Sequence, residues 1–196
     1  MFALKLIAFT VLWTAIIYGL NCVVARGAKR VEPKRALVYI TAVAMIGVYG
    51  EIFLDTIYNA IVGRPLWYYN LLPIHGGFTS AFAPIVWGMY GFHVYLLHDT
   101  LNTKWSITRT RHLALIISLE ALVLEALLTL SAKPFFGEYL YYYLPSDLWH
   151  VTSLQNMPFY FMCGVVIVQV MRRFRREPWF FSALSTFFVG MLVFAF

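Results

Sequence analysis

Charged residues are scarce in this chain. Only 12% of its 196 residues are charged, while 61% are hydrophobic, and the mean hydropathy is +0.73. A soluble domain is usually about half apolar and a quarter charged. One soluble core cannot hide this much apolar surface, so the composition predicts an integral membrane protein whose surface is largely covered by lipid.

The chain also lacks the motifs of several enzyme classes. Its two cysteines, Cys22 and Cys163, lie in apolar segments, and no CxxC or Cys/His spacing indicates zinc or a disulfide. No glycine-rich phosphate loop, serine-nucleophile motif or HExxH sequence occurs. The Glu-x-x-His pairs of di-metal carboxylate bundles are missing as well. We therefore expect no metal and no other cofactor.

The net charge of +6 does not indicate nucleic-acid binding. The basic residues form short clusters between apolar runs, which is typical of membrane topology rather than of a binding stripe. We expect no nucleic acid among the partners, and instead a membrane lipid or a lipid-soluble small molecule.

Long apolar runs predict an all-α bundle of about six transmembrane helices in a single domain, residues 1–196. Each run can cross a hydrocarbon core of about 30 Å at about 1.5 Å per residue. The first run lacks the clustered basic residues and cleavage motif of a signal peptide, which favours a spanning helix. The last run has no polar flank, so five helices are the alternative. The runs cover residues 3–24, 36–62, 78–98, 113–131, 150–171 and 179–196.

The basic residues predict the orientation. All of the 15 Lys and Arg residues except Lys5, Arg64 and Lys133 lie in the loops after the first, third and fifth runs. The positive-inside rule then places these loops in the cytoplasm and both termini on the other side. A bacterial inner membrane is the expected location. The loops contain Arg26, Lys29, Arg30, Lys34, Arg35, Lys104, Arg109, Arg111, Arg172, Arg173, Arg175 and Arg176.

A short internal repeat relates the second and third runs to the fourth and fifth. Glu51 stands at the same distance before Pro65 as Glu120 stands before Pro134. An aromatic loop, another proline, a histidine and a Thr-Ser pair follow in both copies. Two parallel copies about an axis along the membrane normal, as in some transporters, would explain this pattern. Chance similarity is the alternative.

Four of the nine acidic residues fall inside predicted helices: Glu51, Asp55, Glu120 and Glu125. A carboxylate in hydrocarbon is costly and persists by facing the bundle interior and finding a partner. Glu51 and Asp55 are one helical turn apart, and Asn59 follows on the same face. No Lys or Arg lies at this depth. Burial then favours the protonated form of at least one acid.

This set of acids predicts acid–base chemistry. A protonated acid can give a proton to an alkene, and an ionised neighbour can remove one or stabilise a carbocation. We predict an isomerase-like or cyclase-like enzyme that acts on an isoprenoid or another lipid-soluble molecule, with the four acids as catalytic residues. The expected substrate-binding residues near the outer helix ends are Asn59, Trp67, His75, His150, Gln155 and Asn156.

Two other functions fit the same residues. A small proton-coupled transporter would use a carboxylate as its proton carrier. A non-enzymatic membrane subunit or assembly factor would use the acids in a hydrogen-bonded network that orients helices.

Overall fold

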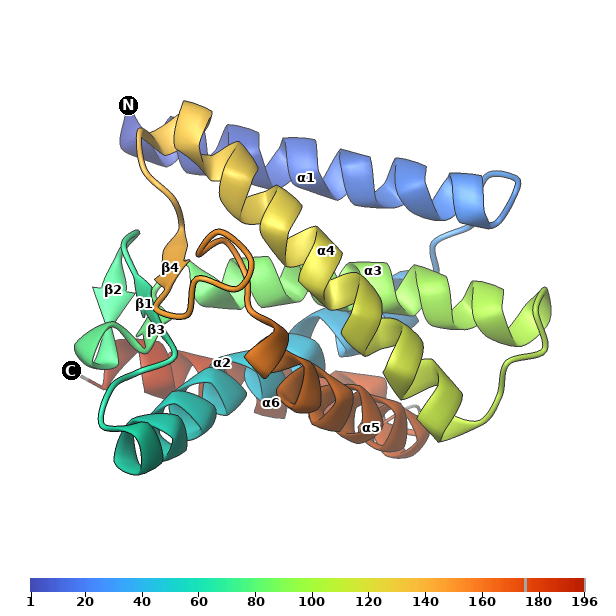
Figure 1. Ribbon diagram of the computed structural model, residues 1–196. Helices are drawn as coiled ribbons and strands as arrows, with labels where there is room; N and C mark the ends of the chain where they lie inside the picture. Colours follow the sequence, from blue (N-terminus) through green and yellow to red (C-terminus); the bar gives the residue numbers. More distant parts are fainter. Residues whose placement is uncertain (175, 196) are drawn as a thin grey trace.

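The computed structural model of the protein describes residues 1–174 and 176–195 and is a helical bundle (Figure 1). Two predicted features lie outside the described residues: Arg175 in the third basic loop, and Phe196 at the end of the last run. The described part contains six α-helices: α1 Phe2–Val24, α2 Pro33–Val62, α3 Ala83–Thr103, α4 Thr110–Phe136, α5 Met157–Phe174 and α6 Pro178–Phe194.

Four segments are long and apolar enough to cross a membrane: α1, α2, α4 and Leu154–Phe174, which contains α5. The sixth helix is apolar but has only 17 residues. Helix α3 has 21 residues and includes His93, His98 and Asp99, which lower its hydropathy. The chain is therefore an α-helical integral membrane protein with at least these four candidate spans.

The helix ends follow from local sequence. Proline stands in the first turn of α2, α3 and α6, where its missing N–H costs no hydrogen bond. Helices α2 and α4 both end at a glycine in the left-handed conformation, Gly63 with φ 77° and Gly137 with φ 88°. Only glycine adopts this conformation without a steric penalty, so both helices stop there.

Two predicted helix starts are wrong. The third helix begins at Ala83 rather than 78, and the fifth begins at Met157 rather than 150. Strand β3 Thr79–Ser80 and the 3-10 turn η2 Leu154–Asn156 lie in the intervening residues, and β2 Pro73–Ile74 and η1 His75–Gly77 directly precede β3. Apolar and aromatic residues in these turns resemble helix in a hydropathy pattern, although their backbone bends back on itself.

A two-stranded ribbon joins the two aromatic loops. Strand β1, Trp67–Tyr69, pairs antiparallel with β4, Tyr141–Tyr143, and Tyr68 opposes Tyr142 at its centre. Because one ribbon holds both loops, α2 and α4 end at the same side of the bundle, and α3 and α5 start from that side.

Both termini also lie at the ribbon end of the bundle (Figure 1). The rings of Phe2 and Phe136 are 6.0 Å apart, which fixes the start of α1 beside the end of α4. The Nε2 atom of His75 lies 3.1 Å from the carbonyl oxygen of Leu192, near the end of α6. An ion pair of 2.5 Å between Lys29 and Asp99 lies at the opposite end.

The pairs α2–α3 and α4–α5 form two equivalent halves. The backbone N–H of Asn70 donates to the carbonyl of Leu140, and that of Leu144 donates to Leu66. Exchanging the two halves exchanges these two bonds. The ribbon therefore has a local pseudo-two-fold axis through its centre.

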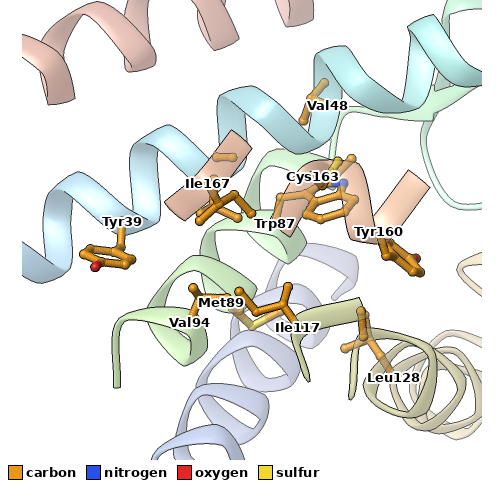
Figure 2. Packing of buried hydrophobic residues seen from close by; sticks show 14 of the residues in the cluster. Tyr39, Val48, Trp87, Met89, Val94, Ile117, Leu128, Tyr160, Cys163 and Ile167 are labelled. Carbon is orange, nitrogen blue, oxygen red and sulfur yellow. The ribbon is translucent and has the colours of Figure 1, made fainter. Parts of the chain in front are cut away.

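Equivalent glycines hold each half together. A Cβ atom on Gly91 of α3 would lie 2.9 Å from the Cα atom of Ile40, and one on Gly164 of α5 would lie 2.9 Å from that of Ala114. Small residues let membrane helices approach this closely. Trp87, Cys163 and Ile167 lie next to α2 in the interior between the halves (Figure 2).

Alanine at either crossing should therefore destabilise the protein. We expect Gly91→Ala and Gly164→Ala each to lower the free energy of unfolding by about 1–3 kcal/mol, because the helix backbones must move apart. Thermal unfolding in detergent measures this loss. Gly19→Ala in α1 is the control, since nothing lies within 4 Å of a Cβ atom there. Equal unfolding midpoints for all three variants would contradict the prediction.

Candidate functional site

A partly open cavity of about 80 Å³ lies between the two halves and α1. This space can hold several water molecules or one end of a larger ligand. Helices α1 and α4 contribute apolar side chains such as Trp13, Ile17 and Leu128. Two carboxyl groups, those of Glu51 and Glu125, also line it. The remaining rings around it are Tyr69, Trp87, Tyr90, Tyr141 and Tyr160.

Glu51 accepts three hydrogen bonds. Its Oε1 atom accepts from the hydroxyl of Tyr69 and, at 2.8 Å, from the indole N–H of Trp87. Its Oε2 atom accepts from the hydroxyl of Thr79 at 2.5 Å. The ring of Trp87 reaches this position because Gly47, one turn before Glu51, leaves room for it; a Cβ atom there would lie 2.0 Å from the indole.

Glu125 has a matching set of donors. The hydroxyl of Tyr143 donates to Oε1 at 2.6 Å, and the hydroxyl of Thr152 donates to Oε2. Tyr160 also bonds this carboxyl group through its side chain. Both glutamates thus sit in apolar surroundings with several hydrogen bonds each, which is the arrangement that makes a buried carboxyl group tolerable.

The repeat alignment inferred from sequence is corrected by these contacts. It paired Glu51 with Glu120, because both precede a proline by the same distance. In the structure Glu51 corresponds to Glu125, since the tyrosine and threonine that bond each one occupy equivalent positions of the two halves. The Thr-Ser pairs were aligned correctly, and their threonines are the donors.

A smaller pocket of about 10 Å³ lies under the ribbon, lined by both glutamates. Trp67 and Asn156 are the two expected substrate-binding residues that line it. The side-chain N–H of Asn156 donates to the hydroxyl of Tyr143 at 2.6 Å, and the indole N–H of Trp67 donates to the carbonyl of Phe78. The pocket has about the volume of one water molecule.

Asp55 lies outside the cavity lining. It is fully buried, and its Oδ1 atom accepts from the backbone N–H of Leu66 at 2.5 Å. The carboxyl group thereby fixes the chain that leaves α2 and enters β1. The geometry gives Asp55 a role in positioning the ribbon.

Glu120 is bonded to His93, a partner that the sequence analysis had not assigned to it. The Nε2 atom of His93 bonds Oε2 of Glu120, and the hydroxyl of Tyr90 donates to Oε1 at 3.0 Å. The other ring nitrogen of His93 lies 2.8 Å from the amide nitrogen of Asn21. The sequence has no Lys or Arg at this depth, and the basic side chain that contacts Glu120 is a histidine. Tyr90 connects this cluster to the cavity that its ring lines.

The other expected substrate-binding residues do not line either pocket. Gln155 accepts from the hydroxyl of Tyr58 at 2.7 Å, and Asn59 is half-buried one turn after Asp55. His75 contacts the end of α6. His150 stacks on Tyr142 with ring centroids 4.5 Å apart.

Sequence reasoning missed the donors that surround the two glutamates. Trp87 and Tyr160 looked like ordinary aromatic residues of apolar helices, and nothing in the aromatic loops indicated that their tyrosines bond the acids. The duplicated Thr-Ser pair was the available signal, because a polar pair kept in two copies beside a buried acid predicts a shared partner.

Within the described part of the chain, no three His, Cys, Asp or Glu side chains lie close enough to hold a metal ion. Comparison of the chain with protein-family models, with curated proteins and with solved structures found no match.

Loss of His93 should destabilise the bundle. We expect His93→Leu to lower the free energy of unfolding by about 3 kcal/mol, because Glu120 loses its partner in apolar surroundings. Glu120→Leu in the same protein should restore most of the loss, since no uncompensated carboxylate remains. Thermal unfolding in detergent measures both changes. His112→Leu, at an exposed histidine, is the control; an equal loss there would contradict the prediction.

Proposed function

We propose that the protein is an intramembrane acid–base enzyme, isomerase-like or cyclase-like, that acts on an isoprenoid or another lipid-soluble molecule. The observation that carries the proposal is the presence of Glu51 and Glu125 on one cavity whose other walls are apolar and aromatic. The proposal reduces the four expected catalytic acids to these two. In this proposal Asp55 positions the ribbon, and Glu120 belongs to the hydrogen-bond network beside the cavity.

The chemistry follows from the residues of the cavity. One carboxylic acid gives its proton to a carbon of a C=C bond, which leaves a carbocation on the substrate. The other glutamate, as a carboxylate, takes a proton from a neighbouring carbon, and a new C=C bond forms. Aromatic faces such as those of Trp87 and Tyr90 attract the transient positive charge. The net result moves a double bond or closes a ring without any co-reactant.

The proposal includes a membrane arrangement of six spans with both termini outside the cytoplasm, in a bacterial inner membrane. Two observations support it. The ribbon joins the ends of α2 and α4, so α3 has to return across the membrane between them. The clustered basic residues lie at the opposite end from the ribbon, as the positive-inside rule requires for a cytoplasmic end.

Deuterium labelling tests the proposed reaction. Membranes containing the protein are incubated in D₂O, and the extracted isoprenoids are analysed by mass spectrometry. We expect the protein to add deuterium to one lipid species, because the acid exchanges its proton with solvent and passes it to carbon. Glu51→Gln and Glu125→Gln should each lower this incorporation by about 100-fold or more.

Glu138→Gln is the matched control, since Glu138 is exposed after the end of α4. It should label the same lipid as the unchanged protein. Full incorporation in either cavity variant would contradict the proposed enzyme, provided that the variant elutes as folded protein.

A proton-coupled carrier is the second candidate, favoured by the pseudo-two-fold relation between α2–α3 and α4–α5. Parallel repeats about such an axis occur in several transporters, with the site at the repeat interface. For this function we expect proteoliposomes to accumulate the molecule that co-purifies with the protein when a pH gradient is imposed. Glu51→Gln and Glu125→Gln should abolish that uptake. Uptake that does not depend on the pH gradient would contradict a proton-coupled carrier.

A further inference from the structure

The two cavity glutamates have equivalent surroundings that differ at three positions, one of them in the ribbon, where Trp67 of one half corresponds to Tyr141 of the other. A tyrosine from the ribbon and a threonine before the next helix bond each of them. The backbone N–H groups of Phe82 and Gln155 occupy equivalent positions, because each donates to the hydroxyl of the serine two residues earlier, Ser80 or Ser153. The following residue is Ala83 in one half and Asn156 in the other. One turn later stand Trp87 and Tyr160.

The shell of Glu51 fits an ionised carboxylate. The indole N–H of Trp87 can only donate, so the oxygen that it bonds has to accept. The hydroxyls of Tyr69 and Thr79 donate to the same carboxyl group. Among the described residues neither hydroxyl has a second acceptor. If Glu51 were protonated, one of these hydroxyls would have to turn its proton away from the carboxyl group. That proton would then be buried without an acceptor, which is costly.

The shell of Glu125 accommodates a proton. All of its side-chain partners, Tyr141, Tyr143, Thr152 and Tyr160, are hydroxyls, which can donate or accept. Tyr143 has a second neighbour, the amide of Asn156. The Oδ1 atom of that amide is buried without a hydrogen-bond partner. If the amide turns over, Oδ1 accepts the proton of Tyr143, and the Tyr143 oxygen accepts a proton from Glu125.

We propose that Trp87 and Asn156, aided by Tyr160, decide which glutamate carries the proton: Glu125 is the acid and Glu51 is the carboxylate. Trp87 and Asn156 are positioning residues that act through the two glutamates. The assignment rests on the proposed function and gives the reaction a direction. Glu125 breaks its O–H bond and forms a C–H bond on the substrate, and Glu51 receives the proton that leaves the neighbouring carbon. Transfer of that proton back to Glu125 through the small pocket restores the resting state.

Infrared spectroscopy of the purified protein at neutral pH tests the assignment without any substrate. A protonated carboxyl group has a C=O stretching band that a carboxylate lacks. We expect the difference between unchanged protein and Glu125→Gln to contain a lost C=O band. The difference for Glu51→Gln should contain lost carboxylate bands only. Size-exclusion chromatography and circular dichroism establish that each variant is folded.

Variants of the positioning residues supply a second arm. Asn156→Ala makes the Glu125 half resemble the Ala83 half, and we expect it to weaken the C=O band. Trp87→Phe removes the obligatory donor from Glu51, and we expect a second C=O band that disappears in the double variant with Glu51→Gln. Gln155→Ala, at the amide next to Asn156, is the control and should leave the spectrum unchanged.

The proposal is overturned if Glu51→Gln removes the C=O band, if both glutamine variants remove it, or if neither does. If Glu125→Gln does not fold, the Asn156→Ala spectrum decides: an unchanged C=O band overturns the proposal. The proposed function can fail independently of this proton assignment. A protein that never labels a lipid with deuterium can still show the expected bands, and an active enzyme can show the opposite ones.

Discussion

A carboxyl group inside a membrane protein has to be supplied with hydrogen bonds by the protein itself. Here that requirement applies twice, at Glu51 and at Glu125. The donors come from the segments that follow each helix: a tyrosine in the ribbon and a threonine before the returning helix. The ribbon therefore does more than join two loops. It carries the tyrosines down onto the acids, and Asp55 fixes its first strand through the N–H of Leu66.

Two acids share one cavity because the two helix pairs place their glutamates on opposite sides of the same space. Glu51 of α2 and Glu125 of α4 both line it. The equivalent glycines, Gly91 and Gly164, bring each returning helix against its partner, so that Trp87 and Tyr160 reach the glutamates. A difference between the halves is enough to make the two acids chemically different, and Trp87 and Asn156 are such differences.

The Glu120–His93 pair belongs to one half only, and α1 completes it through Asn21. Its position beside Tyr90 places a second acid–base pair next to the cavity, on the side away from the ribbon. An imidazole can neutralise a carboxylate at a depth where Lys and Arg are absent. Glu120 thus has an imidazole partner, whereas the carboxyl groups of Glu51, Asp55 and Glu125 accept hydrogen bonds from neutral donors.

Composition and apolar run length determined the membrane class, the number of helices and the presence of buried acids. These properties depend on whether each segment is more stable in lipid or in water, and the hydropathy of the segment itself determines that. The pairing of Glu51 with Glu125, the ribbon, and the partner of Glu120 were decided by tertiary structure. Rotation of each helix about its axis and the direction of each loop depend on contacts between segments far apart in the chain. A single sequence does not show which distant segments touch. The acids could therefore be grouped only by their depth, and the spacing of the prolines gave the wrong alignment of the repeat.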